Sequence, residues 1–230
     1  MKITALIPFW SGYKPLKSSL SSKPLVKVGG KSLINRSIEV LNSIELVEST
    51  IVFTSNTEIS NHIDDSAKYQ ILHRDARLNT DKTSTEDIIN EFLMSSDTDI
   101  VILIQPKSPF VRAETIQDCI EKVSVGGFDS AFVATQLFHS IKRQAWYQGK
   151  PLNYLIDTDS IILHELEPVL VESCSIYIFT RELFEKNHKF ISENPYIKEV
   201  GHFEGFEVNN KDDLIMAELM INAGLDKDFE

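Results

Sequence analysis

Apolar runs alternate with amphipathic stretches along most of the chain. Residues 2–8, 50–55 and 99–104 form continuous apolar runs rich in β-branched side chains, which is typical of strands buried on both faces of a sheet. Between them, apolar residues recur at helical spacing, beginning after a predicted N-cap at Ser32. Alternation of strand and helix favours an α/β fold, a parallel sheet with helices on both faces and ligands bound beyond the carboxyl ends of the strands.

Shorter segments complete the predicted sheet and its helices. Ser84, with Asp87 three positions later, has the spacing of a capping box and predicts the start of a helix. Asn210 is predicted to cap the closing helix, which Gly224 ends. The further predicted strands are residues 69–72, 130–135, 175–179 and 207–208, and the further predicted helices are residues 58–68, 114–123, 181–190 and 211–222.

Residues 139–172 interrupt this alternation. The segment holds Trp146, Tyr147 and Tyr154, a Gly-Lys-Pro turn and an apolar, acidic second half. An excursion of this length forms either a lid or an oligomerisation arm, and the pattern alone leaves both open. With 230 residues and no internal repeat, we expect one domain over residues 1–230, with 139–172 as an inserted dimerisation or lid subregion.

Composition argues against several classes of function. The formal net charge of −11 disfavours nucleic acid as a partner, because binding to a phosphate backbone needs an extended basic face. The apolar runs are far shorter than the ~20 residues that span a bilayer, and no signal peptide precedes Ile3, so we expect a cytoplasmic protein without membrane contact. Cys119 and Cys174 lack the spacing of a metal site and stand in apolar patterns, which indicates buried, reduced thiols.

Positive charge is concentrated at the start of the chain. Residues 1–38 contain seven Lys and Arg and no Asp or Glu, so the remaining residues hold 16 basic against 34 acidic side chains. This basic segment runs from a strand through a loop into a helix, where backbone N–H groups, the helix dipole and ammonium groups can converge on a phosphate chain. We favour phosphate binding over the alternative, a solvated basic loop.

A second loop with candidate chemistry follows the predicted strand at residues 99–104. Pro106 and Pro109 make this loop rigid, which suits a segment that holds Gln105, Ser108 and Arg112 at fixed positions. A plain connection between a strand and a helix is the alternative.

Four blocks of sequence stand in order along the chain: residues 7–14 with 23–24 and 30–33, residues 74–85, residues 104–112, and residues 172–178. In the same order, they resemble four motifs of the N-acylneuraminate cytidylyltransferase family. The first block is similar to the family's opening IPARGGSKG motif with its later K-N and GKPL residues, and the second to RPxxLAxDxxS/T. The third is similar to LQPTSPLR with one residue added, and the fourth to ENGAIYI.

The resemblance implies a three-layer α/β/α nucleotidyltransferase with a mostly parallel sheet, acting as a homodimer through a protruding arm at residues 139–172. Enzymes of this family transfer CMP from CTP to a 2-keto-3-deoxy sugar acid, such as a sialic acid, and release pyrophosphate. Catalysis of this kind consists largely of positioning and of neutralising phosphate charge. We therefore expect CTP and a sugar acid as substrates, Mg²⁺ as cofactor, and Trp146 with the apolar residues near Leu163–Leu170 buried between subunits.

The same resemblance implies roles for individual residues. Lys14, Lys23 and Arg112 would be catalytic, and the Arg112 guanidinium can clamp a carboxylate with two hydrogen bonds. Glu207 and Asn209 would hold Mg²⁺. The sugar acid would contact Gln105, Ser108, Arg112 and Tyr177, and the nucleotide would contact Pro8, Trp10, Ser11, Gly12, Lys14, Lys23, Arg74, Asp81 and Ser84.

Several positions depart from the family pattern, among them Pro24, which stands where the family has an Asn, and three departures change the charge of the site. Trp10 stands where the family has an Arg, Asn56 where the second strand usually delivers an Asp, and Asn209 where an Asp serves Mg²⁺. One cation and two carboxylates are therefore replaced by neutral side chains. Two alternatives stay open: a homologue that binds nucleotide or sugar without turnover, and a nucleotidyltransferase that acts on a different sugar acceptor.

Overall fold

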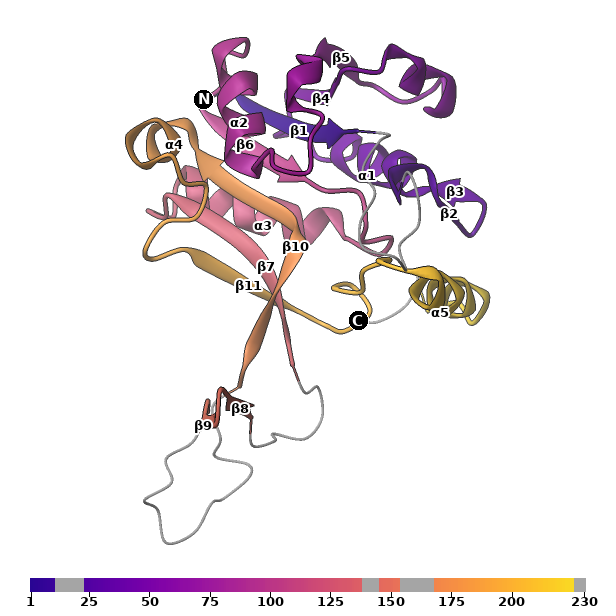
Figure 1. Ribbon diagram of the computed structural model, residues 1–230, viewed down its shortest axis with the longest axis vertical. Coiled ribbons are helices and arrows are strands. Elements are labelled where there is room, and N and C mark those ends of the chain that lie inside the picture. The colour runs from indigo at the N-terminus through magenta and orange to yellow at the C-terminus, as the bar shows by residue number, and fades with distance from the viewer. Residues whose placement is uncertain (11–22, 138–144, 154–167, 226–230) are drawn as a thin grey trace, which may run out of the picture.

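A seven-stranded sheet forms the centre of the computed structural model, which describes residues 1–10, 23–137, 145–153 and 168–225 (Figure 1). Its strand order is β11-β7-β10-β6-β1-β4-β5, and β10 alone runs antiparallel to its neighbours, β6 and β7. The predicted mostly parallel sheet is confirmed. The strands are β1 (Ile3–Phe9), β4 (Ser49–Thr54), β5 (Gln70–His73), β6 (Ile100–Ile104), β7 (Ser130–Gln136), β10 (Leu170–Thr180) and β11 (Tyr196–Val200).

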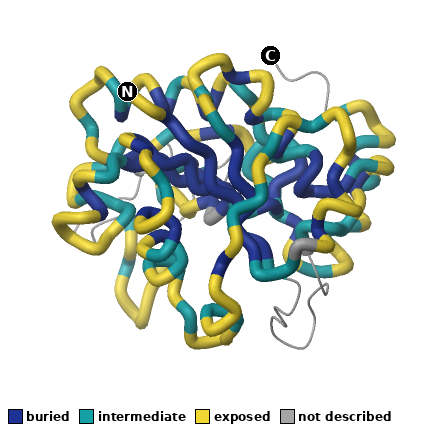
Figure 2. The backbone as a smooth tube through the Cα atoms, turned by 90° about the horizontal axis from the view of Figure 1, so that it is seen from above, coloured by how far each residue is buried: buried dark blue, intermediate teal, exposed yellow. Residues whose placement is uncertain are grey.

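Helices cover both faces of this sheet. Alternate residues of β1 point to opposite faces, so Ile7 packs with α1 and α3, whereas Leu6 packs with α2 and α4. Figure 2 shows the buried strands at the centre, between more exposed helices and loops. The result is the expected three-layer α/β/α architecture. The helices are α1 (Leu33–Asn42), α2 (Thr85–Met94), α3 (Ala113–Ser124), α4 (Arg181–Asn187) and α5 (Lys211–Asn222), with 3₁₀ turns η1 (Lys23–Leu25), η2 (Thr57–His62) and η3 (Ala76–Leu78).

Side-chain caps begin the helices where the sequence predicts them. The Ser84 hydroxyl accepts from the Asp87 N–H, and the Asp87 carboxylate accepts from the Ser84 N–H, both over 3.0 Å. Asn210 and Asp213 form a second capping box at the start of α5. Gly224, with a φ of 74°, follows the end of α5 in the left-handed conformation that favours glycine.

Two predicted elements are wrong in type. Of the predicted helix at residues 58–68, only the part up to His62 is helical, as the 3₁₀ turn η2. The helix does not continue, because the Asp64 N–H donates to the Asn35 side chain of α1 in place of a helical carbonyl. Residues 207–208 are not a strand: Val208 N–H donates to the Lys107 carbonyl over 2.8 Å, but no ladder follows. Asn56, where the family usually has an Asp, caps η2 and accepts from the Glu58 N–H.

The edge strand β11 was not predicted from the sequence, and its side-chain contacts explain why. Tyr196 and Lys198, two residues apart on the same face of the strand, both bind the Asp118 carboxylate of α3, over 2.9 and 2.7 Å. Polar side chains therefore point from β11 toward a helix, so the apolar alternation that marks a half-buried strand is missing. Helix α4 also ends earlier than predicted, because His188 adopts the left-handed conformation with a φ of 50°.

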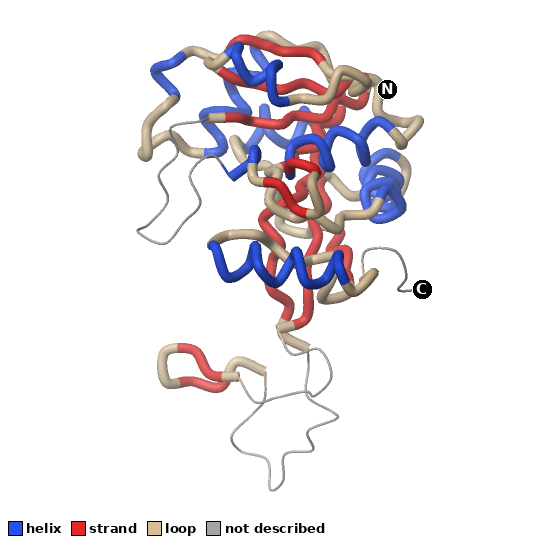
Figure 3. The backbone as a smooth tube through the Cα atoms, turned by 90° about the vertical axis from the view of Figure 1, so that its right-hand side faces the viewer, coloured by secondary structure: helices blue, strands red, loops and turns tan. Residues whose placement is uncertain are grey.

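An arm extends from the sheet at the ends of β7 and β10 (Figures 1 and 3). The strand β10 is longer than predicted, with a shift in its pairing to β7 between Glu172 and Tyr177. A small hairpin, β8 (Trp146–Tyr147) with β9 (Lys150–Pro151), belongs to this region. Tyr154 and residues 163–167, which the prediction includes, lie outside the described residues.

Two expectations from composition bear on the described residues. No helix among them is both long and apolar enough to cross a membrane. Cys119 is a free cysteine, fully buried in α3, as predicted, and burial raises the pKa of its thiol to about 12. The side chain of Cys174 lies outside the described part of the structure.

Candidate active site

A cavity of 480 Å³ opens where β1, β5 and β6 end at their carboxyl sides. Chain segments that follow these three strands, together with the residues before α5, form its walls. Binding sites of parallel α/β sheets are found at this edge. The lining residues that concern the chemistry are Pro8, Trp10, Arg74, Asp81, Gln105, Lys107 and Asn209.

Six of the residues predicted for the site therefore line a single cavity: Pro8, Trp10, Arg74, Asp81, Gln105 and Asn209. Ser84 lies between two further lining residues, Thr83 and Thr85, but its hydroxyl caps α2. Lys23 begins η1, next to the lining residue Pro24, and its side chain is not described. Ser11, Gly12 and Lys14 lie outside the described residues.

Arg74, which follows β5, is a buried cation in the wall of the cavity. Its side chain is 1% exposed, its Nη2 donates to Asn79 Oδ1 over 2.7 Å, and its Nε has no hydrogen-bond partner within the described structure. Burial lowers the pKa of this guanidinium, and the nearby Glu91 carboxylate partly opposes that effect. The arginine stays protonated at neutral pH. A buried charge with few partners is costly, so acceptor groups of a ligand would complete its hydrogen bonding.

The loop after β6 is anchored to β10, as a rigid wall requires. The Gln105 N–H donates to the Ser175 carbonyl over 2.8 Å, and the Ser108 and Ser175 hydroxyls share a hydrogen bond. Gln105 lines the cavity, whereas Ser108 is buried against β10. The proline-flanked loop therefore holds Gln105 in place as predicted, with Ser108 as part of its support.

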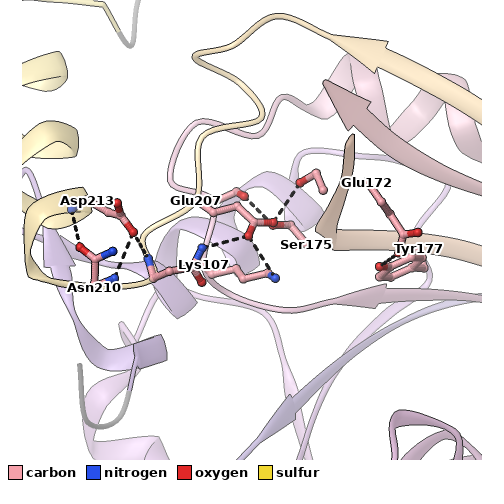
Figure 4. Close-up of polar contacts among 10 residues, drawn as sticks. Lys107, Glu172, Ser175, Tyr177, Glu207, Asn210 and Asp213 are labelled. Atoms are coloured by element: carbon pink, nitrogen blue, oxygen red, sulfur yellow. Dashed lines mark hydrogen bonds and ion pairs between the residues drawn. The ribbon is translucent and has the colours of Figure 1, made fainter. Parts of the chain in front are cut away.

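The other two residues predicted for the sugar acid do not line the cavity. Arg112 is an exposed residue at the N-cap of α3, and its backbone N–H donates to the Glu204 carboxylate over 3.2 Å. Tyr177 is buried: its hydroxyl donates to the Glu172 carboxylate (Figure 4), and its ring packs edge-on against Phe190 at 5.0 Å.

Glu207, four residues before α5, lies in a polar network with side chains from the loop after β6 and from β10 (Figure 4). Its Oε1 accepts from the Ser173 and Ser175 hydroxyls over 3.2 and 3.0 Å. Its Oε2 accepts from the Asn209 amide over 3.2 Å and lies 3.2 Å from the Lys107 ammonium. Both carboxylate oxygens are therefore already engaged by side chains of the protein.

This arrangement does not fit a magnesium ion held by the predicted pair, Glu207 and Asn209. The described residues contain no group of three His, Cys, Asp or Glu side chains that could hold a metal ion. Mg²⁺ can be bound by one or two carboxylates together with substrate phosphates, but they need free oxygens. A dication at Glu207 would have to displace Lys107 or lie beside its positive charge.

Of the charged residues that line the cavity, Lys107 is the one that the predicted site omits. Its only sequence signal is the added residue between Gln-Pro and Ser-Pro in the loop after β6. Its partner Glu207 lies far along the chain, so the ion pair could not be inferred from local spacing.

Comparisons with known proteins agree with this geometry. A family model described as "Cytidylyltransferase" matches residues 17–161. CMP-N,N'-diacetyllegionaminic acid synthase of Legionella pneumophila is 29% identical over 202 residues, which cover 84% of each chain. N-acylneuraminate cytidylyltransferase of Oncorhynchus mykiss is 24% identical over 74% of this chain and 43% of its own length.

Solved structures show the same fold. A CMP:2-keto-3-deoxy-manno-octonic acid synthetase complexed with CTP superposes with a TM-score of 0.71 at 17% identity, covering 97% of this chain and all of its own. 4-Diphosphocytidyl-2C-methyl-D-erythritol synthase from Anaerococcus prevotii gives a TM-score of 0.64 at 13% identity, covering 96% and 98%. The motif resemblance is thereby confirmed, and because the family model spans more than half of the chain, the protein belongs to the cytidylyltransferase family.

Proposed function

We propose that the protein transfers CMP from CTP to a 2-keto-3-deoxy sugar acid, a sialic acid or a related nonulosonate, with release of pyrophosphate. The observation that carries this proposal is the single cavity that joins Arg74, after β5, with Trp10, after β1, and Gln105, after β6. Family membership supplies the nucleotide, and the names of the relatives supply the class of acceptor.

The order of the strands suggests how the substrates lie. Since β1 separates β6 from β4 and β5, Arg74 and Gln105 lie at opposite ends of the cavity. We place the nucleoside beside Arg74, the phosphates over the end of β1 and the sugar acid beside Gln105. The anomeric hydroxyl of the sugar would attack the α-phosphorus, and pyrophosphate would leave.

The residues of this chain would act by positioning and by neutralising charge. We assign the triphosphate to the first loop, with Lys14 and Lys23 as its catalytic cations and Ser11 and Gly12 as further contacts. Asp81 and Ser84, between β5 and α2, stay as proposed contacts of the nucleoside. Arg112, Ser108 and Tyr177 stay as candidates for the sugar acid only if the loops rearrange when it binds.

Mg²⁺ remains the expected cofactor, carried on the phosphates of CTP, because phosphate oxygens are ligands that this hard cation prefers. When bound, it would neutralise charge on the triphosphate. Asn209 would then line the cavity, and Glu207 would pair with the lining residue Lys107.

We also propose a homodimer formed through the arm, in the cytoplasm, whose CMP-sugar product would serve polysaccharide biosynthesis. Apolar side chains on the arm support the dimer: Trp146, Tyr147 and Val171 are 58%, 64% and 43% exposed in the single chain. Exposed apolar groups that gather in one region are typical of an interface between proteins.

The test measures pyrophosphate released from CTP when the protein is incubated with Mg²⁺ and each of a panel of sialic, legionaminic and 3-deoxy-manno-octulosonic acids. We expect release with at least one acid and with CTP in preference to ATP, GTP and UTP. Binding of CTP without release from any acid would favour the binding-only alternative. Preference for another nucleotide would contradict the cytidine assignment.

A further inference from the structure

Lys107, which lines the cavity, forms an ion pair with Glu207, with 3.2 Å between Nζ and Oε2. Their side chains are only 15% and 18% exposed. Figure 4 shows Glu207 between Ser175 of β10 and the Lys107 side chain. An ion pair this well shielded from water is held more firmly than one on the surface.

Three hydrogen bonds from other side chains hold the Glu207 carboxylate in place. Ser173 and Ser175, alternate residues on one face of β10, donate to its Oε1, and the Asn209 amide donates to its Oε2. Ser175 is 1% exposed and also bonds the Ser108 hydroxyl. Glu207 is therefore placed to orient a cation.

The ammonium of the pair keeps hydrogens for a ligand. A lysine ammonium has three donors, and within the described structure its sole ion-pair partner is Glu207. The backbone of Lys107 is also fixed, since its carbonyl accepts from the Val208 N–H over 2.8 Å. A cation fixed in this way can bind an anion with little cost in side-chain ordering.

We propose that Lys107, oriented by Glu207, binds an anionic oxygen group of a substrate in this cavity and supplies at this wall the positive charge that a protein-held dication would otherwise supply. The group is a phosphate of the nucleotide or the carboxylate of the acceptor. The identity of these substrates rests on the proposed function, whereas the anion site itself rests on the ion pair. Lys107 is then a substrate-binding residue and Glu207 a positioning residue.

Variants of both residues test the inference. Lys107→Gln removes the charge, Lys107→Arg keeps it, and Glu207→Gln keeps the shape of the positioning residue. The double variant K107Q/E207Q removes both charges together, so no carboxylate is left buried without its cation if K107Q alone unfolds. Lys186→Gln is the matched control, because Lys186 is an exposed lysine on α4, after β10, at the opposite end of the sheet.

Two measurements distinguish the two anions: calorimetric titration with CTP and Mg²⁺, and the KM of the sugar acid at saturating CTP. We expect K107Q and the double variant to weaken one of them by about 10- to 100-fold, as for a lost hydrogen bond to a charged group. K107R should restore most of that loss, E207Q should cause a smaller loss in the same quantity, and K186Q should match wild type. A change in CTP affinity assigns the phosphate, and a change in KM alone assigns the carboxylate.

Unchanged values for K107Q in both measurements would overturn the inference. Loss of activity in E207Q with higher demand for Mg²⁺, while K107Q stays normal, would also overturn it, because Glu207 would then be a metal ligand. Failure of the proposed function gives a different result: wild-type protein would release no pyrophosphate, yet K107Q would still bind either CTP or the sugar acid more weakly than wild type in a calorimetric titration.

Discussion

Asn79 holds Arg74 in the wall of the cavity: Arg74 Nη2 donates to Asn79 Oδ1 over 2.7 Å, and Asn79 Nδ2 donates to Ser55 Oγ over 2.7 Å. Through Asn79, the side chain of Arg74, which follows β5, is therefore connected to Ser55, which follows β4. A guanidinium that is buried, oriented and short of partners is suited to bind a ligand with several acceptors.

We therefore expect Arg74→Ala to weaken CTP binding by at least about tenfold, since hydrogen bonds to charged groups contribute about 1.5–3 kcal/mol. Isothermal titration with CTP measures this. Arg77→Ala is the matched control, because Arg77 lies three residues away with a side chain that is 72% exposed. Equal CTP affinities of R74A and wild type would contradict the role of Arg74.

The capping box at α5 supports the residues that precede it in the cavity wall. Asn210→Ala removes a side chain that accepts from the Asp212 and Asp213 N–H groups. We expect the free energy of unfolding to fall by about 1 kcal/mol, as for other N-cap replacements. Urea unfolding measures this free energy, and Asn222→Ala, at the far end of α5, is the control. An equal loss of unfolding free energy in both variants would contradict the role of Asn210 as a cap.

Asp118 links α3 to the edge strand β11 and makes stability depend on pH. The hydrogen bond from Lys198 lowers the pKa of this carboxyl, so its contribution to stability is present above the ordinary Asp pKa of about 3.9 and is lost as the pH falls through the lowered value. Asp118→Asn should cost up to about 1 kcal/mol at pH 7 and nothing in strong acid. Thermal unfolding across this pH range measures it.

The control for that experiment is Asp97→Asn, because the Asp97 side chain is fully exposed. Its unfolding should track the wild type at every pH. A difference between D118N and wild type that persists unchanged into acid would mean that the carboxylate charge is not responsible.

The arm gives a prediction about assembly. If Trp146 is covered by a second subunit, wild-type protein sediments as a dimer at micromolar concentration, and Trp146→Glu shifts it to monomer because the interface would have to bury a charge. Leu46→Glu, at an exposed apolar residue on the body, should leave the dimer intact. Sedimentation of wild type as a monomer would exclude the proposed interface.

Local patterns were sufficient to predict the centre of the fold. The continuous apolar runs of β1, β4 and β6 identify central strands because both faces of each are buried, and the spacing of Ser84 with Asp87 identifies a helix start. In contrast, β11 was not predicted. Tyr196 and Lys198 contact Asp118 of α3 through polar atoms, so the strand lacks the apolar alternation that would have identified it.

The site was predictable where a motif residue ends a strand and less so where it depends on distant contacts. Arg74 and Gln105 each follow a strand directly, so their place at the sheet edge follows from topology. The Lys107–Glu207 pair joins residues that are far apart in sequence, and only the fold brings them together. The family resemblance assigned Glu207 to Mg²⁺, because its contacts with Ser173, Ser175 and Lys107 depend on the fold and cannot be inferred from the sequence.

Transfer of the α-phosphate is the most direct test of the account. CTP labelled with ³²P at the α- or the γ-position is incubated with the protein, Mg²⁺ and the acceptor panel, and the products are separated by chromatography. We predict that the α-label appears in a CMP-sugar and the γ-label in pyrophosphate. No α-label on any acceptor, or γ-label on an acceptor, would contradict a cytidylyltransfer reaction in this cavity.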